Sequence, residues 1–343
     1  MVHEPVLLGE AIGNLNIKPG DTVVDGTLGA GGHSGEILKK ILPNGRLISI
    51  DRDEKAIENF RKIILKSRQV RICPAPINNN TNSEKNFPEN NKIGNRGENI
   101  AEYWCGVSDN YANLKEILAG LGISAADAVL VDLGFSSDQI EDPERGFSFQ
   151  KDGPLDMRYS PAAQESTAAG VVNGYSEREL ARIFKIYGEE KFARRIAGAI
   201  AEYRKERKIG RTKELVEIIG SAVPQKYRNS RIHFATRVFQ ALRMEVNQEL
   251  PNLKSFLDQA KDVLASGGRL AVISFHSLED RIVKEFFRLH SKDCVCPPNF
   301  PKCVCKHRKT LEIITRKPIQ AGDSEISANP RARSAKLRVA EKI

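Results

Sequence analysis

Apolar residues recur along the chain with two different periods, and the alternation of these periods predicts the fold class. Short, β-branched apolar runs of the kind that form buried strands occur in four places. They are "DTVVDGTL" at 21–28, "GRLISIDRD" at 45–53, "DAVLVDLG" at 127–134 and "GGRLAVISF" at 267–275. Segments of helical periodicity alternate with them, namely "GEILKKIL" at 35–42, "EKAIENFRKIIL" at 54–65 and "NLKSFLDQAKDVLA" at 252–265. This alternation predicts an α/β domain with a parallel sheet covered on both faces.

A long stretch between the third and fourth predicted strands, at 139–239, has the periodicity of helices. It contains "SERELARIFKIYG", "EKFARRIAGAIAEYRKER" and "TKELVEIIGSAV", and it predicts a helical domain inserted into the α/β domain. We therefore expect a core built from 1–138 and 240–343, with a basic tail at the C-terminus. The segment 74–100 is rich in Asn and almost devoid of apolar residues, so we expect a disordered surface loop there.

The charge of the chain is unevenly distributed, which bears on its partners. The net charge is +9, and 176–243 alone holds 17 Lys and Arg against 8 Asp and Glu. The segment 284–343 holds 14 against 6. Clustered basic charge is typical of proteins that bind polyanions, although a solvated helix face gives the same pattern. The chain has no apolar run of membrane-spanning length and no signal-peptide pattern, so we expect a cytoplasmic protein without a membrane partner.

Four glycines lie within seven positions directly after the first predicted strand, in "VVDGTLGAGGHSGEIL" at 23–38. A strand followed by glycines and a helix is how α/β proteins bring a nucleotide-like ligand against bare backbone. The Lys-Ser/Thr pair of a phosphate-binding loop is absent. Asp51 ends the second strand about 20 residues further on, where an acid can accept hydrogen bonds from both hydroxyls of a ribose. The pattern indicates a nucleoside-type cofactor and leaves S-adenosylmethionine and NAD both open.

A series of motifs resembles, in order, the bacterial small-subunit (16S) ribosomal RNA cytosine-N4 methyltransferase family. The motifs are "DGTLGAGGHS", "SIDRD", "LVDLGFSSDQI", "ERGFSFQKDGPLDMR", "YGEEKFARRIA", "TKELVEII", "FQALRMEVNQEL", "ISFHSLEDRIVK" and "NPRARSAKLRVAE". The resemblance runs from about His3 to the C-terminus, and its main departure is the Asn-rich segment 74–100, where relatives have a much shorter connection. It implies a Rossmann-like S-adenosylmethionine-dependent methyltransferase core with an inserted helical domain.

The resemblance also implies a set of residues that contact the cofactor. They lie after three of the predicted strands and are Gly31, Gly32, His33, Asp51, Tyr111, Asp132 and Gln139. The glycines and His33 would line the methionine end, Asp51 would hold the ribose, and Tyr111 would lie beside the adenine. Each of these residues alone has a structural explanation, such as a helix cap for His33. Their joint occurrence at strand ends favours a ligand site.

Asp132 is the residue that we expect closest to the chemistry. Methyl transfer from a sulfonium to the cytosine N4 requires the nitrogen lone pair to point in line at the methyl carbon, so positioning carries most of the catalysis. An acceptor for the amine hydrogens would also stabilise the positive charge that grows on nitrogen. Asp132 ends the third strand, where amino-methyltransferases generally carry an Asp/Asn/Ser-Pro-Pro-aromatic motif, although this chain lacks the prolines.

The target base must leave its stack to reach such a site. The loop 144–158, "ERGFSFQKDGPLDMR", follows Asp132 closely and is the candidate wall of the base pocket. Its candidate substrate residues are two aromatics and two arginines, namely Arg145, Phe147, Phe149 and Arg158. The resemblance implies that the base is a decoding-region cytosine of 16S rRNA and that the substrate is the assembled small ribosomal subunit. A homodimer is left open.

The cysteines bear on two further hypotheses. Methylation at carbon 5 needs a thiolate nucleophile, and no cysteine lies near 132–139, which favours nitrogen as the acceptor. Four cysteines form two C-x-C pairs, at Cys294, Cys296, Cys303 and Cys305. They could supply four thiolates to zinc, but structural zinc sites usually have C-x-x-C spacing, so we predict no metal. His276, at the end of the fourth strand, could reach the base or order its loop, and we assign it no catalytic role.

Two functions of other classes explain less of the sequence. An NAD-dependent dehydrogenase would need a complete pyrophosphate loop, and it gives no reason for the basic segments. A non-catalytic RNA-binding protein explains the charge but not the glycine loop with its acid.

Overall fold

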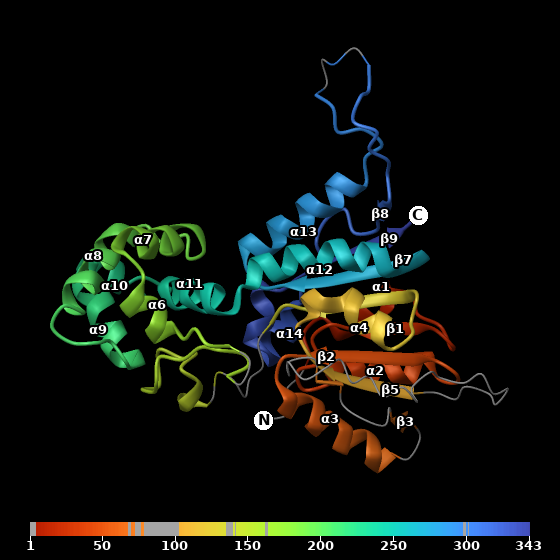
Figure 1. The fold of residues 1–343 in the computed structure, drawn as a ribbon, viewed down its shortest axis with the longest axis horizontal. Coiled ribbons are helices and arrows are strands. Elements are labelled where there is room, and N and C mark those ends of the chain that lie inside the picture. Colours follow the sequence, from red (N-terminus) through yellow and green to blue (C-terminus); the bar gives the residue numbers. More distant parts are fainter. Residues whose placement is uncertain are drawn as a thin grey trace. The chain divides into compact units, whose positions relative to one another are not determined.

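The computed structural model describes residues 5–67, 70–72, 77–78, 103–134, 140, 142–161, 164–297, 300 and 302–343. The chain forms two compact units (Figure 1). The sheet unit comprises Met1–Gly134 and Asn252–Ile343, and the helical unit comprises Phe135–Pro251. The second boundary therefore falls after 251, whereas the sequence placed it after 239. The difference arises because the helix at 236–247 packs into the core of the helical unit.

The strands of the sheet unit are β1 Thr22–Asp25, β2 Arg46–Asp51, β3 Arg71–Ile72, β4 Ile77–Asn78, β5 Tyr103–Ser108, β6 Ala126–Asp132, β7 Leu264–Ser274, β8 Leu311–Ile313 and β9 Lys336–Lys342. Its helices are α1 Leu8–Leu15, α2 Gly32–Ile41, α3 Glu54–Ser67, α4 Leu114–Gly120, α13 Ser277–His290 and α14 Asp323–Ala328, with short 3₁₀ turns η2 Tyr111–Asn113 and η4 Pro330–Ser334. Helix α12, Glu249–Val263, begins in the last residues of the helical unit and continues into the sheet unit.

The strands of the described residues form one sheet in the order β3-β5-β2-β1-β6-β7-β9-β8, with β4 also paired to β5. Strands β5, β2, β1, β6 and β7 run parallel, as the alternation of strands and helices predicted. Among the described strands, the parallel arrangement ends at the C-terminal strand β9, which lies antiparallel between β7 and β8. The α/β fold class is thereby confirmed.

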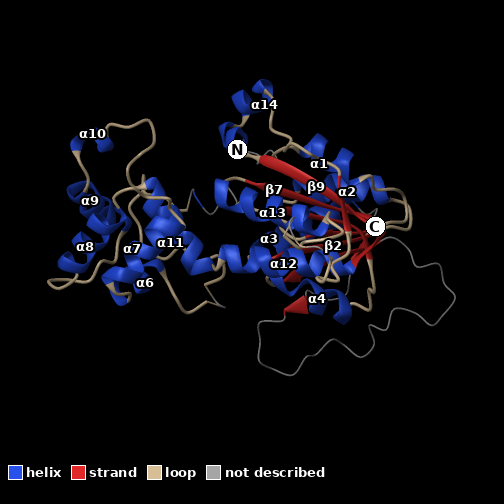
Figure 2. Cartoon of the chain, turned by 90° about the horizontal axis from the view of Figure 1, so that it is seen from above, coloured by secondary structure: helices blue, strands red, loops and turns tan. Residues whose placement is uncertain are grey.

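Two layers of helices cover the sheet, one on each face (Figure 2). Apolar residues of α1, α2 and α3 form one buried cluster with the strands. Residues of α4, α12 and α13 form the other. Val23 and Val24 on β1 point to opposite faces and join different clusters, as expected when successive strand residues alternate. Burial on both faces of the sheet therefore explains why the apolar residues of β1 follow one another without alternating with polar residues.

The expected basic tail at the C-terminus is wrong for the last strand. Leu337, Val339 and Ala340 of β9 are fully buried in the sheet. Arg338 is also almost buried, and its Nε donates to Asp280 Oδ1 at 2.6 Å. The basic residues of this segment thus alternate with apolar residues that complete the core, and an ion pair accounts for the buried guanidinium.

The Asn-rich segment 74–100 lies almost wholly outside the described residues. Ile77–Asn78 are described and pair with Val107 and Ser108 of β5. The expectation of a disordered loop therefore fails for these two residues, because they extend the edge of the sheet.

The helical unit consists of α6 Ala168–Gly174, α7 Glu177–Ile186, α8 Ala193–Tyr203, α9 Thr212–Ala222, α10 Gln225–Arg228 and α11 Thr236–Asn247, with the 3₁₀ turn η3 Pro143–Arg145. These elements enclose a hydrophobic core of their own. Local sequence fixes the ends of these helices. Ser176, for example, caps α7 through a reciprocal pair of hydrogen bonds with Glu179. In the part of the chain that the structure describes, no helix is long and apolar enough to cross a membrane.

Candidate functional site

Four acidic residues gather where adjacent parallel strands of the sheet unit end. Asp25 ends β1, Asp51 ends β2, Asp109 follows β5 and Asp132 ends β6. The chain passes from β1 to β2 and β5 on one side of β1, and then to β6 on its other side. The strand order therefore reverses beside β1, and ligands of open α/β sheets bind in the crevice outside the carboxyl ends at such a point.

The glycine loop joins β1 to α2 and turns back on the sheet. The N–H of Leu28 donates to the Ile50 carbonyl at 2.9 Å, and the N–H of Gly29 donates to Asp51 Oδ2 at 2.8 Å. Gly29 and Gly31 both have positive φ, at 52° and 83°. A side chain is disfavoured in this conformation, so the turn itself requires glycine.

The two glycines of positive φ differ in what surrounds them. A Cβ on Gly31 would lie 2.1 Å from the Phe60 ring, whereas a Cβ on Gly29 would meet nothing within 4 Å. A Cβ on Gly32 would lie 2.7 Å from Pro5. Internal packing thus explains Gly31 and Gly32, whose expected contact with the cofactor stays a prediction. Gly29 is the position that leaves open space at the carboxyl edge of the sheet.

A substitution at Gly31 should therefore destabilise the fold. We expect Gly31→Ala to lower the free energy of unfolding by about 2–4 kcal/mol, because the left-handed backbone and the clash with Phe60 add. Gly29→Ala should cost only the backbone term of about 1 kcal/mol. Urea unfolding of both variants measures the difference, and equal losses would contradict the packing explanation.

Asp51 is held at the end of β2 by backbone donors. Its Oδ2 accepts from Gly29, and its Oδ1 accepts from the N–H of Asp53 at 2.8 Å. Burial raises the pKa of Asp51 to about 6, against the opposite effect of these two hydrogen bonds. A carboxylate has about four acceptor positions, so Asp51 can also accept from a diol while its Oδ2 holds the glycine loop.

Tyr111 lies at the start of η2, after β5. It is half-buried, and its ring meets Phe256 edge-on at a centroid distance of 5.3 Å. A Cβ on Gly26 would lie 3.5 Å from the Tyr111 Cβ, so this residue adjoins the glycine loop. The structure thus brings Tyr111, named from the family resemblance, to the same edge of the sheet as Asp51, and its contact with an adenine stays a prediction.

Asp132 and His33 face each other near the start of α2. His33 Nδ1 lies 3.9 Å from Asp132 Oδ2, and the exposed fractions of the two side chains are 6% and 17%. His33 Nε2 lies 3.1 Å from the Val6 carbonyl, which can only accept, so Nε2 carries the proton. The Asp132 N–H donates to Thr27 Oγ1 at 2.7 Å, and its Oδ1 accepts from Gly134 at 3.2 Å. The carboxylate is therefore oriented by the loops that follow β1 and β6.

Two acids at this edge were not predicted as site residues from the sequence. Asp25 is buried, with hydrogen bonds from Ser34 Oγ at 2.7 Å and the Thr27 N–H at 3.1 Å. Asp109 is buried as well and accepts from the amide of Asn113 at 2.9 Å. An acid at the end of the apolar run "VVD" could have revealed Asp25. Asp109 could not be placed, because β5 itself had not been recognised.

The burial of Asp25 has a consequence for stability against pH. Burial raises its pKa to about 6, although charge on His33 and the Ser34 hydrogen bond act in the opposite direction. The folded state thus keeps a proton that the unfolded chain loses near pH 4, so stability falls as pH rises through about 4 to 6.

Asp25→Asn removes this titration and keeps one oxygen as an acceptor. Relative to the wild type, its free energy of unfolding should rise by about 1.4 kcal/mol between about pH 5 and pH 8. Urea unfolding at the two pH values gives the measurement. Glu116→Gln, at an exposed acid of α4, is the control. A difference that does not change with pH for Asp25→Asn would show that Asp25 titrates like an exposed acid.

The candidate substrate residues lie within the helical unit, where their side chains make internal contacts. Arg158 forms a two-pronged pair with Asp156, with Nε–Oδ1 at 2.8 Å and Nη2–Oδ2 at 2.7 Å. Arg145 Nη2 donates to the carbonyls of Arg158 and Tyr159, both at 3.0 Å. Phe147 stacks on Tyr159, at a centroid distance of 5.6 Å. These contacts give the residues a structural role.

Phe149 has a similar environment, since it stacks on the His233 ring at a centroid distance of 4.6 Å. The expectation that this residue, Phe147 and the two arginines contact a base stays a prediction. Gln139, expected beside the cofactor, lies outside the described residues.

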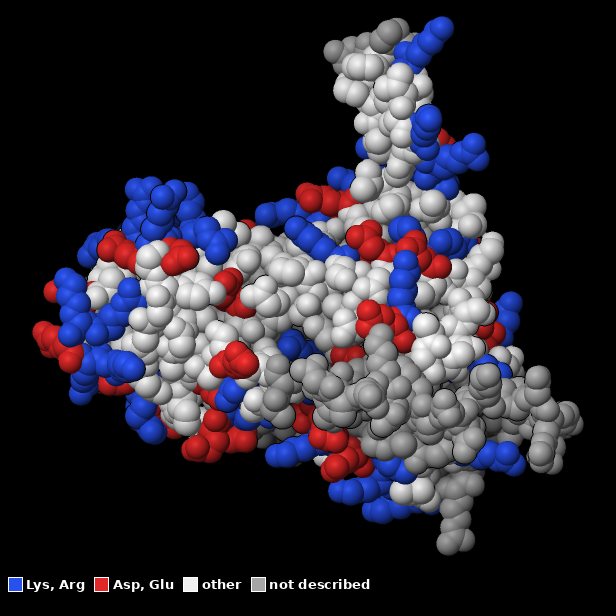
Figure 3. Space-filling model, in the orientation of Figure 1, with Lys and Arg blue, Asp and Glu red and all other residues white. Residues whose placement is uncertain are grey.

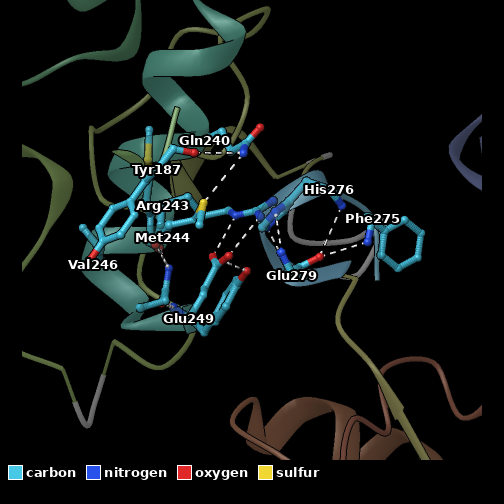
Figure 4. Close-up of polar contacts among 12 residues, drawn as sticks. Tyr187, Gln240, Arg243, Met244, Val246, Glu249, Phe275, His276 and Glu279 are labelled. Atoms are coloured by element: carbon cyan, nitrogen blue, oxygen red, sulfur yellow. Dashed lines mark hydrogen bonds and ion pairs between the residues drawn. The ribbon is translucent and has the colours of Figure 1, made fainter. Parts of the chain in front are cut away.

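Contacts within each unit explain two further polar clusters, one around Glu249 and one around His276. Figure 4 draws both clusters. In the helical unit, Arg243 holds Glu249 through Nε and Nη2, at 2.8 and 3.0 Å, and the Tyr159 hydroxyl donates to the same carboxylate at 2.9 Å. In the sheet unit, His276 caps α13, because its Nδ1 accepts from the Glu279 N–H while its Nε2 lies 2.9 Å from Glu279 Oε1. The structure thus shows His276 as a helix cap, which agrees with the loop-ordering role and does not test a contact with the base.

The chain is similar in sequence over nearly its whole length to known proteins. The family model described as the MraW methylase family matches residues 1–95 and 95–343. A protein named ribosomal RNA small subunit methyltransferase H from Halothermothrix orenii is 45% identical over 341 residues, which covers 99% of this chain and 98% of that protein. A protein of the same name from Carboxydothermus hydrogenoformans is 46% identical over 341 residues, with the same coverage.

Proposed function

Because this chain belongs to the MraW methylase family, we propose that it methylates small-subunit ribosomal RNA with S-adenosylmethionine as the methyl donor. The family predicted from the sequence motifs is confirmed by the match to 1–95 and 95–343. The proposed acceptor is the exocyclic N4 of a cytosine in the decoding region of 16S rRNA. The proposed substrate is the assembled small subunit, and the cytoplasm is the proposed place of action.

One observation supports the cofactor most strongly, namely the open glycine turn beside an oriented acid. Asp51 holds the N–H of Gly29 and keeps acceptor capacity for a diol, and the Cβ direction of Gly29 is open. The aromatic ring of Tyr111 lies at the same edge of the sheet. These residues fit a nucleoside with a free ribose, and the loop lacks the Lys-Ser/Thr pair of the phosphate-binding P-loop. They therefore fit S-adenosylmethionine, which when bound supplies an electrophilic methyl group on a sulfonium.

The acidic groups favour nitrogen over carbon as the acceptor atom. A carbon-5 methyltransferase needs a thiolate, yet among the described cysteines Cys105 is buried within β5 and the others lie at 294–305. The side chain that ends β6 is the carboxylate of Asp132. A carboxylate accepts hydrogen bonds from an amine and stabilises positive charge on it, which is what transfer to N4 requires.

In this mechanism the residues of the chain orient the reacting groups, and none of them forms a bond to the methyl group. Asp132 holds one hydrogen of the cytosine amine and so aims its lone pair. Thr27 and Gly134 fix the backbone and carboxylate of Asp132. His33, anchored on the Val6 carbonyl, lies beside the carboxylate oxygen that faces it. The amine proton that becomes acidic as the bond forms leaves to Asp132 or to solvent.

The proposed RNA substrate is supported by the charge of the helical unit. Exposed basic side chains of α8 and the turn that follows include Arg194, Arg195, Lys205, Arg207 and Lys208. Figure 3 shows Lys and Arg gathered on the surface of this unit. A polyanion is attracted by such a surface, and the attraction falls with salt.

Transfer of a labelled methyl group tests the proposal. The purified protein is incubated with labelled S-adenosylmethionine and, separately, with small subunits, large subunits and protein-free 16S rRNA. We expect label in the RNA of small subunits and little in the other two. Label confined to large subunits would contradict the proposed RNA, and stronger labelling of free 16S rRNA would contradict the assembled substrate.

A further inference from the structure

Four cysteines converge on a projection of the sheet unit that the proposed function does not use. The projection, described at 292–297, 300 and 302–309, leaves the end of α13 and returns to β8, and its described residues stand out from the body of the sheet unit in Figure 1. Its cysteines are Cys294, Cys296, Cys303 and Cys305, all of them free thiols at least partly open to solvent. All four sulfur atoms lie within 4.8 Å of one another.

Three of the sulfur–sulfur distances are close to the edges of a tetrahedron, and Cys296 Sγ lies within 4.8 Å of the other three sulfurs. Cys294 Sγ lies 3.4 Å from Cys303 Sγ and 3.8 Å from Cys305 Sγ. Cys303 Sγ and Cys305 Sγ are 3.6 Å apart. A tetrahedral zinc ion with Zn–S bonds of about 2.3 Å holds its sulfurs about 3.8 Å apart. The thiols are therefore grouped at nearly the distances that coordination would give them.

The backbone around the cluster also directs its N–H groups at sulfur. Val295 N–H points to Cys305 Sγ at 3.5 Å, and Val304 N–H points to Cys296 Sγ at 3.5 Å. Cys296 N–H points to Cys294 Sγ at 3.4 Å. Such donors stabilise the thiolate form and orient metal ligands from the layer behind them. Each C-x-C pair thus places its two sulfurs together and receives an N–H from the opposite pair.

From this geometry we propose that Cys294, Cys296, Cys303 and Cys305 bind a single Zn²⁺ ion as a structural tetrathiolate site. Binding releases the thiol protons to water and leaves a site of net charge −2. Five basic residues and one acid lie within 292–309, so the segment carries compensating positive charge. The prediction of no metal from the C-x-C spacing is thereby replaced. This site does not rest on the proposed function.

The projection buries too little apolar surface to be ordered by packing alone, and a bound ion would order it. Its larger apolar side chains are exposed, with exposed fractions of 42% for Val295, 54% for Phe300 and 66% for Val304. A segment that buries so little apolar surface cannot order itself by a core. Four zinc–sulfur bonds close its loop and hold these side chains outward in one arrangement.

Metal content and cobalt substitution of the full-length protein test the site. The protein, prepared with reductant, should contain one zinc per chain, which a chelator removes. Cobalt(II) added to the chelated protein should give the intense visible and thiolate-to-metal absorption of tetrahedral sulfur coordination. Cys294→Ser combined with Cys303→Ser should abolish both results. Cys105→Ala, in the buried strand β5, and His307→Ala, beside the cluster, should retain them.

Trypsin supplies a second readout that is independent of activity. Cleavage after Lys302 and Lys306 should be at least about 10-fold faster in the chelated protein than in the zinc-loaded protein, since the loop opens without the ion. Three results would overturn the proposal: weak octahedral cobalt absorption, the visible spectrum of bound iron in the purified protein, or equal cleavage with and without zinc. Loss of methyl transfer alone, with zinc retained, would count against the proposed function and not against this site.

Discussion

Replacing Asp132 by alanine is expected to slow the methyl-transfer step by about 10²-fold or more, the scale seen when one preorganised electrostatic contact is lost. Asp132 ends β6 next to the glycine loop, and its carboxylate is held by Gly134 and faces His33. Alanine removes the acceptor for the amine hydrogen, so the lone pair is no longer aimed and the charge on nitrogen is no longer offset. Single-turnover transfer to small subunits at saturating cofactor is the measurement.

The matched variant Asp132→Asn keeps one carbonyl oxygen as an acceptor and should lose less activity than Asp132→Ala. Cofactor affinity has to be measured for both variants by calorimetry, because Asp132 is also expected to contact the cofactor. A normal single-turnover rate for Asp132→Ala at saturating cofactor would contradict a catalytic role. Asp132 would then be a binding residue only.

The second large effect is expected at the other end of the cofactor site. Asp51→Ala should weaken S-adenosylmethionine binding by about 10²-fold, because hydrogen bonds to a charged acceptor contribute about 1.5–3 kcal/mol each. The same variant releases the N–H of Gly29, which Asp51 holds at 2.8 Å, so the open turn also loses its anchor. Isothermal calorimetry with S-adenosylmethionine gives the affinity, and NAD serves as the comparison ligand.

Two variants separate the ribose contact from general effects of charge. Asp51→Asn keeps one acceptor and should fall between the wild type and Asp51→Ala. Glu54→Gln, at an exposed acid in the first turn of α3, should leave the affinity unchanged. Equal affinity of Asp51→Ala and the wild type would remove Asp51 from the cofactor site, and tight binding of NAD would favour the dehydrogenase.

The sequence predicted those elements whose pattern is set by the sheet itself. The strands at 22–25, 46–51 and 126–132 are buried on both faces, so each appears as an apolar run that ends in an acid. β5 was missed because "YWCGVS" lacks such a run and follows the Asn-rich segment. β9 was missed because its Lys and Arg alternate with apolar residues, and the ion pair that compensates Arg338 comes from distant Asp280.

For the candidate site, the sequence predicted the edge of the sheet on which it lies and missed the packing around its residues. The edge that carries Asp51 and Asp132 followed from the strand ends, since parallel strands bring their carboxyl ends together. The reason for Gly31 could not be found, because its neighbour Phe60 lies on α3 and only the folded chain brings the two together. The sequence did not predict the internal contacts of Arg158 either, although its partner Asp156 is only two residues away.

Analysis of the modified nucleoside tests the central proposal most directly. Small subunits methylated by the purified protein are digested to nucleosides, which are separated and identified by mass spectrometry, and the modified position is mapped on 16S rRNA. We predict N4-methylcytidine at a cytosine of the decoding region, and at least about 100-fold less of it when Asp132→Ala replaces the wild type for the same short reaction time. A methyl group on carbon 5 of cytosine, on another base or on a ribose would contradict the proposal.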